Sequence, residues 1–406
     1  MSLQRDLEAT VRDSALKVAA KSERIAALLV TQPGRGVAAA VDGLLSTQDD
    51  RLAVFLAAYL SLLPGAEEAK ARAAGRLLEE PELALAATWL VPWLPAALID
   101  RVVAEYTRHP DSDSPLASVV FAVGVFAPER LRAHRKQLLD DDLRKAMLSG
   151  GPDEWVDEFR RRWSSERSVD ALDSIARFRT AKAAGTLHGL RDEVDDREQW
   201  ETWIEMAGLM PDGRSPSHAS PAFMGFVAER AESPHQMGGR WGGVAPLCAV
   251  CDAPAQRVLT LSASSLPFAL RDDPSFFWYS CECGVLESTS TQQLPGGLRV
   301  IAGPAGDGGN PTGPVPGARS LVLTLHPNQS GVSVDATGGF ARHQVGGAPQ
   351  WIQPVAHPHC PLCRAPMKFL ASIDSGMTPF GRLGFTGILY GFWCDPCATT
   401  TMIRQA

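Results

Sequence analysis

The sequence predicts an α+β multidomain protein in which an all-α N-terminal part is followed by a duplicated, β-rich C-terminal part. Three observations support this prediction. Apolar residues recur at helical spacing up to residue 210, short apolar or alternating runs among dense Gly and Pro follow residue 231, and all eight cysteines lie after residue 247. The first pattern is typical of helices and the second of strands. With 406 residues, 45% of them hydrophobic, the chain can build two or three domains with real cores.

The N-terminal part, 1–210, is predicted to be a series of helices of about 10 to 17 residues joined by short turns. Leu7 and Val11 begin an apolar stripe, and Pro115 and Pro152 mark helix starts, where the missing N–H of proline costs nothing. Stacked helices of this length are typical of a HEAT-like solenoid. Because no motif repeats at a fixed period, a compact irregular helical bundle is the alternative.

One uncharged stretch, 83–99, has to be weighed as a membrane span. A spanning helix needs about 20 apolar residues, and this stretch is shorter and is broken by Pro92 and Pro95. We therefore expect a buried helix pair and no membrane association. The start of the chain carries charges of both signs, which predicts no secretory signal.

The segment 211–230 is predicted to be a linker. Its first part is polar and rich in turn residues, and 223–231 is expected to add one short helix. Two β modules, 231–318 and 319–406, should follow the linker. Strand signals lie at 257–262, 275–280, 298–302, 320–325, 331–335, 367–373, 387–393 and 399–405.

The eight cysteines form four close pairs, and the pairs form two sets of nearly equal spacing. The first set is Cys248, Cys251, Cys281 and Cys283, and the second is Cys360, Cys363, Cys394 and Cys397. In the first set 29 residues separate the two pairs, and in the second set 30 residues do. Two cysteines two residues apart lie on a tight turn, where both thiolates can face one point. Two such turns supply the four ligands of a tetrahedral Zn²⁺ ion, so we predict two structural zinc ions.

Other uses of these cysteines fit the pattern less well. A redox CxxC usually stands alone at a helix N-terminus, and a catalytic zinc keeps an open position, whereas here every pair has a partner pair. His357 and His359 flank Cys360 and could replace a cysteine as ligand, or act as loop residues that hydrogen-bond to the thiolates. Zinc-type spacing without a secretory signal indicates a reducing compartment, so a cytoplasmic protein is expected.

The segments that lead into the two sets also match. HQMGG at 235–239 precedes the first set and HQVGG at 343–347 precedes the second. Such self-similarity indicates an internal duplication. His235 and His343 hold equivalent positions, and we expect them to share a structural role, such as a side-chain bond to the Gly-Gly turn.

The C-terminal part resembles a known family over about 231–406. The resemblance rests on HQVGGAPQWIQ at 343–353, CPLCRAPMKFLASID at 360–374 and LYGFWCDPC at 389–397. These segments resemble the bacterial YwqG-like family of unknown function. That family is similar in turn to the eukaryotic programmed-cell-death-2 group, whose members are chaperones of a small-subunit ribosomal protein. The first module departs from the family pattern, because GGRWGG replaces GGxPxW and its closing pair is CxC.

The resemblance also indicates a loop that could contact a partner. The candidate partner-binding residues in this loop are Gly346, Gly347, Pro349, Trp351 and Gln353. Trp is favoured as a binding anchor, so Trp351 could face a partner. Alternatively, Trp351 packs over the small zinc module.

Charge is distributed unevenly along the chain. After residue 230 there are 10 basic and 10 acidic residues, so the net charge of −7 comes from the N-terminal part. Neither part predicts a basic face for a phosphate backbone, and nucleic-acid binding is therefore not expected. Arg160, Arg161 and Arg162 lie near acidic residues of one predicted helix, which is typical of a solvated face. An acidic helical part suits a basic partner.

No catalytic constellation is recognisable, since neither a G-x-S-x-G elbow nor an H-E-x-x-H motif is present. We therefore predict a zinc-stabilised cytoplasmic protein that binds one protein partner and is not an enzyme. It would be either a toxin-immunity protein or a client-specific chaperone. The alternative is a redox or hydrolytic enzyme that uses the cysteine domain.

Overall fold

The computed structural model describes residues 3–138, 140–218, 221–239, 241, 245, 247–248, 251–279, 288–295, 297–302, 317–328, 343–349, 351–353 and 357–406. These residues belong to two compact units. The helical unit comprises most of the chain up to Pro216 together with a segment that begins at His326, and the sheet unit comprises most of the chain from Ser217 onward. The predicted α+β architecture, helical first and β-rich second, is confirmed.

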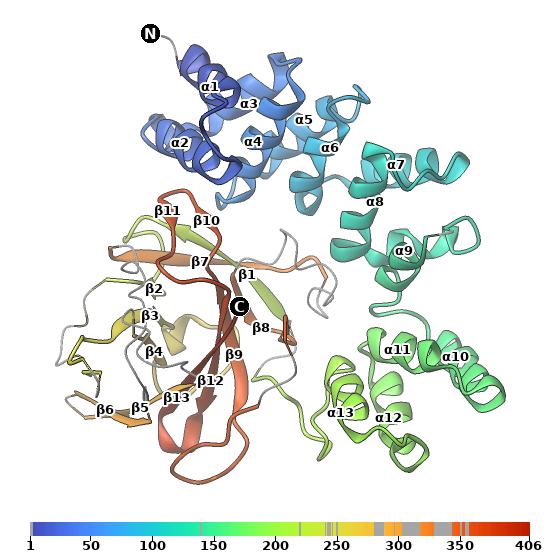
Figure 1. The fold of residues 1–406 in the computed structure, drawn as a ribbon, viewed down its shortest axis with the longest axis vertical. Helices are drawn as coiled ribbons and strands as arrows, with labels where there is room; N and C mark the ends of the chain where they lie inside the picture. Colours follow the sequence, from blue (N-terminus) through green and yellow to red (C-terminus); the bar gives the residue numbers. More distant parts are fainter. Residues whose placement is uncertain are drawn as a thin grey trace. The chain divides into compact units, whose positions relative to one another are not determined.

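The helical unit is a succession of short helices in which sequence neighbours pack together, as α3 does with α4, α7 with α8 and α10 with α11 (Figure 1). Such nearest-neighbour packing is solenoid-like. The α-helices of the described residues are α1 (Leu3–Arg12), α2 (Val18–Val30), α3 (Val37–Ser46), α4 (Asp50–Ser61), α5 (Glu67–Leu77), α6 (Ala84–Ala87), α7 (Ala96–Arg108), α8 (Pro115–Phe126), α9 (Asp141–Ala146), α10 (Asp153–Glu166), α11 (Val169–Arg177), α12 (Ala181–Gly189) and α13 (Arg197–Met206).

Local sequence explains where several of these helices begin. The side chain of Ser114 accepts a hydrogen bond from the backbone N–H of Ala117, and Pro115 occupies the first helical position of α8. Asp196 caps α13 in the same way through the N–H of Gln199. Pro152 immediately precedes α10. The helix starts predicted at the two prolines are therefore confirmed.

The uncharged stretch 83–99 forms part of the helical core. It contains α6, a 3₁₀ helix at Thr88–Trp93 and the first turn of α7. Leu90 and Val91 are fully buried within it. No helix in the described part of the chain is long and apolar enough to cross a membrane.

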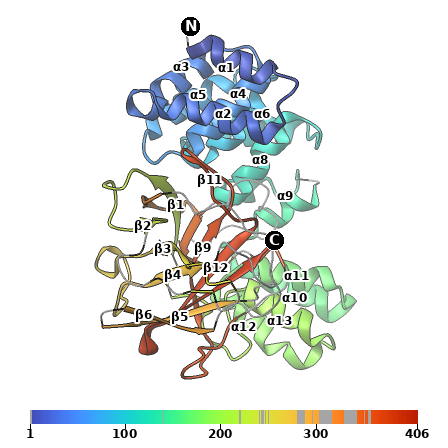
Figure 2. The same cartoon turned by 60° about the vertical axis from the view of Figure 1, so that its left-hand side comes forward.

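The described residues of the sheet unit form one large antiparallel sheet, in which eleven strands are assigned (Figures 1 and 2). Their spatial order is β4-β3-β2-β7-β1-β8-β9-β12-β13-β5-β6. The strands are β1 (Ala222–Ala228), β2 (Gln236–Met237), β3 (Gln256–Thr260), β4 (Ser275–Trp278), β5 (Thr289–Leu294), β6 (Gly297–Ala302), β7 (Arg319–Leu325), β8 (His343–Gly346), β9 (Lys368–Asp374), β12 (Ile388–Cys394) and β13 (Thr399–Gln405), and a separate small ribbon pairs β10 (Met377–Thr378) with β11 (Gly381–Arg382).

Most strand predictions agree with these elements, and one segment does not. The strands β3, β4, β6, β7, β9, β12 and β13 lie at the predicted positions, whereas 331–335 lies outside the described residues. The expectation of a short helix over 223–231 is wrong, because β1 occupies Ala222–Ala228. β1 pairs with β7 along its length and with β8 at its start, so backbone pairing on both sides overrides any local helical preference.

The two predicted β modules share this single sheet rather than forming separate sheets. β1 and β7 pair with each other, and the strands on either side follow the repeat in mirrored order: β2, β3 and β4 on one side, β8, β9 and β12 on the other. The strand β7, which begins the second module, therefore pairs with β2 of the first, and β1, which precedes the first module, pairs with β8 of the second. The predicted linker is also partly integrated, since the backbone N–H of His218 donates to the carbonyl of Phe369 in β9.

Candidate metal centre

The second cysteine set is placed by two tight turns next to the sheet. In the first turn, the N–H of Cys360 donates to the carbonyl of Ala365 at 2.8 Å, and the N–H of Arg364 donates to the carbonyl of Cys360 at 2.8 Å. Arg364 adopts the left-handed conformation with a φ of 63°, which closes the turn. Cys360 and Cys363 consequently lie on the same short loop.

The other two cysteines come from the connection between β12 and β13. Cys394 is the last residue of β12, and Cys397 ends a single 3₁₀ turn, Asp395–Cys397. The indole N–H of Trp393 donates to the carboxylate of Asp395 at 2.9 Å, which anchors this turn to the strand. Ala398 has a φ of 47°, so the chain reverses there into β13.

These two turns bring four thiols together. The Sγ atoms of Cys360, Cys363, Cys394 and Cys397 all lie within 4.8 Å of one another, and those of Cys363 and Cys394 are 3.6 Å apart. Tetrahedral zinc with Zn–S bonds of about 2.3 Å requires sulfur atoms about 3.8 Å apart. The four side chains therefore fit one tetrahedral metal ion, and the predicted grouping of the second set is confirmed. His357 and His359 are not members of this group, which contains only cysteines among the described residues.

The environment of the thiols differs from one to the next. Cys363 is exposed, and a hydrogen bond from the backbone N–H of Ala365 lowers the pKa of its thiol to about 7. Burial raises the pKa of Cys394 and that of Cys397. A bound divalent cation would favour the thiolate form of all four groups, so metal loading would release protons and would weaken as pH falls.

Aromatic side chains cover the buried side of the centre. Trp351 is only 7% exposed, and its ring lies 4.7 Å from that of Tyr390 and 6.1 Å from that of Phe392, measured between centroids. These residues form one apolar cluster with Cys360 and Cys394. Of the two roles considered for Trp351, the structure therefore shows packing over the metal module.

Most of the other candidate partner-binding residues are also buried within the fold. Gly346, Gly347 and Pro349 are buried, and a Cβ atom at Gly347 would lie 2.5 Å from the Cβ of Ala222. Because Gly347 also has a φ of 67°, no other residue fits this position without strain. Gln353 is exposed, and its side chain donates to the carbonyl of Ala406. Among the described residues of this loop, Ile352 and Gln353 are therefore the ones that offer exposed surface to a partner.

The first cysteine set repeats the turn geometry of the second. The N–H of Cys248 donates to the carbonyl of Ala253 at 2.8 Å, the N–H of Asp252 donates to the carbonyl of Cys248 at 3.0 Å, and Asp252 has a φ of 58°. Cys248 is buried and Cys251 is exposed, as are Cys360 and Cys363 respectively. Cys281 and Cys283 lie outside the described residues, so a metal site at the first set stays a prediction, as does the identity of the metal at the second.

The two histidines of the repeat have matching partners. His235 Nδ1 accepts from the N–H of Ser262 at 3.1 Å, and His343 Nδ1 accepts from the N–H of Asp374 at 3.3 Å. In each case the histidine bonds to the backbone at or just beyond the end of the neighbouring strand. A shared structural role is therefore present, although the bond goes to that strand end and not to the Gly-Gly turn.

Comparisons with known proteins add one similarity. A curated protein of Salmonella typhimurium, described as "Uncharacterized protein YpfL", is 37% identical over 87 residues, which is 20% of this chain and 20% of that protein. The chain thus spans about a fifth of the length of the curated relative that it matches. No family model matches the chain. No solved structure matches it either.

Proposed function

We propose that the chain is a zinc-stabilised protein-binding protein in which the metal holds the sheet unit together. The observation that carries this proposal is the set of four cysteine Sγ atoms within 4.8 Å of one another. Four thiolates complete the coordination shell of zinc, and a complete shell leaves no position for a substrate or an activated water. Such a centre contributes to folding rather than to chemistry.

The helical unit supports the binding half of the proposal. Its helices pack on their sequence neighbours, an arrangement that produces extended surfaces suited to protein partners. We further propose that the partner is a toxin or a chaperone client. The resemblance to the YwqG-like family and to the programmed-cell-death-2 chaperones supports the client version, which is an argument by analogy between folds.

One observation favours a redox enzyme as a second candidate. Cys363 is exposed, its thiol has a lowered pKa, and its Sγ lies 3.6 Å from that of Cys394. A low-pKa thiolate can attack an external disulfide, and the neighbouring thiol then displaces the mixed disulfide, so that the two cysteines become joined while the external disulfide is reduced to two thiols. Purified protein without zinc that cycles between a disulfide and a dithiol at these two positions would favour this candidate over the structural centre.

Metal content is the first test. We expect two zinc ions per chain by elemental analysis of protein that has never been exposed to a chelator, because the CxxC turns of the two sets have the same geometry. Cys363→Ser and Cys251→Ser should each lower this content by at least one zinc ion. A wild-type content of one would contradict the prediction for the first set, and a content of zero would contradict the structural centre itself.

Capture of a partner is the second test. We expect the tagged full-length protein, expressed in its source organism, to retain one protein at a stoichiometric level. Association of the purified pair should slow as ionic strength rises, because salt screens the charges that steer encounter. A preparation that retains zinc, captures no protein and turns over a small substrate would contradict the proposal.

A further inference from the structure

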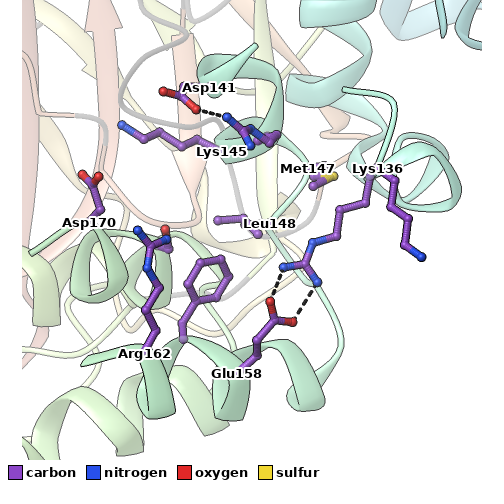
Figure 3. Close-up of a pocket in the computed structure, with 12 residues that line it drawn as sticks. Lys136, Asp141, Lys145, Met147, Leu148, Glu158, Arg162 and Asp170 are labelled. Carbon is purple, nitrogen blue, oxygen red and sulfur yellow. Dashed lines mark hydrogen bonds and ion pairs between the residues drawn. The ribbon is translucent and has the colours of Figure 1, made fainter. Parts of the chain in front are cut away.

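A charged cavity lies within the helical unit, between the turn that follows α8, the helix α9 and the helices α10 and α11 (Figure 3). Its volume is about 700 Å³, within the range of sites that take a ligand of several residues or a small molecule. Five cationic side chains from three segments line it, namely Arg135, Lys136, Arg144, Lys145 and Arg162.

Acidic and apolar groups complete the lining. The acids are Asp141, Glu158 and Asp170, so the cations outnumber them by five to three. Phe159 and Leu148 supply apolar surface between the charges. The cavity is therefore cationic and partly apolar, although the N-terminal part of the chain has a net negative charge.

The two ion pairs inside the cavity differ in how easily a ligand can open them. Arg135 makes two hydrogen bonds to Glu158, at 2.9 and 2.8 Å, and Arg144 pairs with Asp141. In both pairs the acid is more exposed than the cation, at 51% against 29% and at 78% against 48%. The Arg144–Asp141 pair is exposed and contributes little stability, so a carboxylate of a ligand can displace Asp141 at small cost. The two-bond Arg135–Glu158 pair is stronger, and a ligand carboxylate would add to it rather than replace it.

Arg135 is held in place independently of its acidic partner. Its guanidinium carbon lies 4.4 Å from the ring centroid of Trp155. Stacking on an aromatic ring keeps the guanidinium group on the cavity wall when the carboxylate partner changes.

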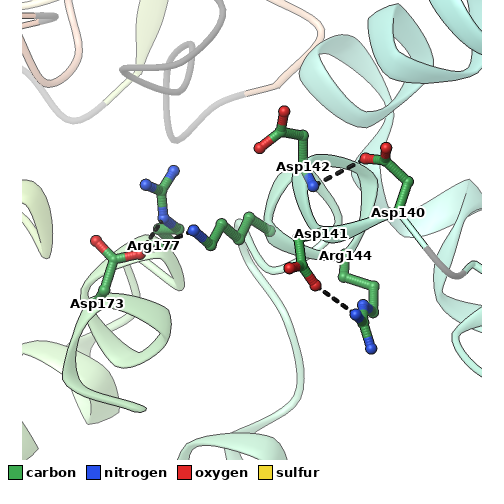
Figure 4. A network of polar contacts seen from close by, with 7 residues as sticks. Asp140, Asp141, Asp142, Arg144, Asp173 and Arg177 are labelled. Carbon is green, nitrogen blue, oxygen red and sulfur yellow. Dashed lines mark hydrogen bonds and ion pairs between the residues drawn. The ribbon is translucent and has the colours of Figure 1, made fainter. Parts of the chain in front are cut away.

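Two further cations of the cavity are incompletely neutralised. Lys145 lies 4.0 Å from Asp173. Asp173 is already hydrogen-bonded to Arg177 at 2.8 Å (Figure 4). Lys136 is exposed and makes no ion pair with any described residue. These two ammonium groups have capacity for an additional anionic partner.

The backbone around the cavity argues against a phosphate site. The Asp140 side chain accepts hydrogen bonds from the N–H groups of Asp142 and Leu143, at 2.9 and 3.0 Å, so the first turn of α9 is already capped (Figure 4). Phosphate sites commonly rely on free backbone N–H groups of this kind. Here the hydrogen-bond donors that line the cavity are long arginine and lysine side chains set apart from one another. Such donors suit several carboxylates spaced along a peptide chain better than one phosphate group.

We propose that this cavity binds an acidic segment of the protein partner, in which carboxylates alternate with apolar side chains. The proposal rests on the proposed function and adds the chemistry of the partner. It differs from the basic partner that net charge predicts, since net charge averages over a whole surface whereas recognition depends on the groups that face the ligand.

A labelled peptide tests this site directly. The probe is a short fluorescein-labelled peptide of alternating glutamate and leucine, titrated with the full-length, zinc-loaded protein and followed by fluorescence anisotropy. A peptide of alternating lysine and leucine is the comparison. We expect the acidic peptide to bind at least about tenfold more tightly, and its affinity to fall as salt rises.

Matched variants assign the binding to the cavity. Arg162→Gln combined with Lys145→Gln should weaken the acidic peptide about tenfold. Arg197→Gln is the control, because Arg197 is about as exposed as Arg162 but does not line the cavity. Each of the two arginines pairs with the glutamate four residues further along its helix, at 2.8 Å for Arg197 and 3.0 Å for Arg162. Asp170→Asn should have the opposite effect and tighten binding about threefold, a sign that a folding defect would not produce.

The proposal is overturned if Arg162→Gln with Lys145→Gln binds the acidic peptide as tightly as Arg197→Gln does. It is equally overturned if inorganic phosphate displaces the peptide where sodium chloride of the same ionic strength does not. If a partner is captured equally well by both variants, the protein-binding function stands and only the cavity assignment fails. If peptide binding depends on the cavity but no partner is captured, the proposed function fails and the acidic-ligand site stands.

Discussion

Replacing Cys363 with serine is expected to unfold the sheet unit while the helical unit stays folded. A structural zinc site contributes on the order of 10 kcal/mol or more to folding, which is comparable with the whole stability of a domain of about 5–15 kcal/mol. Cys363 is one of the four thiols of the described cluster, so its loss opens the shell. Limited proteolysis with mass spectrometry should then yield a stable fragment that ends near Pro216, the end of the main segment of the helical unit, with or without the later segment that begins at His326.

The turn that carries Cys363 also offers a control. Leu362 lies between the two cysteines of the turn and is 40% exposed, so Leu362→Ser should keep the zinc and the wild-type digestion pattern. Treating the wild-type protein with a chelator should reproduce the pattern of Cys363→Ser. If the whole chain of the variant is digested in a single step, the helical unit does not fold independently, and the division into two units is wrong in solution.

The substitution Trp351→Ala is expected to lower the free energy of unfolding of the sheet unit by about 3 kcal/mol. Trp351 is buried against Tyr390 and Phe392, and removal of the indole ring leaves a cavity beside the metal turns. Chemical denaturation followed by circular dichroism measures the change. Zinc content should be unaltered, since Trp351 supplies no ligand.

The neighbouring residue provides the comparison for this substitution. Ile352 is 38% exposed, so Ile352→Ala should change stability by no more than about 0.5 kcal/mol. Wild-type stability of Trp351→Ala, together with loss of the captured partner, would show that Trp351 contacts the partner instead of the core.

The candidate site was partly predictable from sequence because its ligands repeat at short, regular spacing. The pair Cys360 and Cys363 requires a tight turn wherever it occurs, and the structure has that turn. Trp351 was ambiguous, since an aromatic residue in a loop can serve either packing or binding. Its burial depends on Tyr390 and Phe392, which come from a strand about forty residues away in the sequence.

The charged cavity was not predictable in the same way. Arg162 belongs to a run of three arginines that the sequence presents as a solvated face, and this residue is indeed exposed. Only the packing of α9 against its neighbours brings Lys145 and Arg135 to the same cavity. A signal was present in the repeated cationic pairs at 135–136 and 144–145, but the sequence does not specify that they converge.

The sequence by itself determined the division into helical and β-rich parts, most strand positions and the grouping of the second cysteine set. These properties depend on periodicity, capping and turn chemistry, which act over a few residues. The tertiary structure alone decided that Ala222–Ala228 is a strand, that the two halves of the repeat share one sheet and that Trp351 is buried. The physical reason is that strand pairing and burial join residues far apart in the chain, and their energies outweigh local preference where the two disagree.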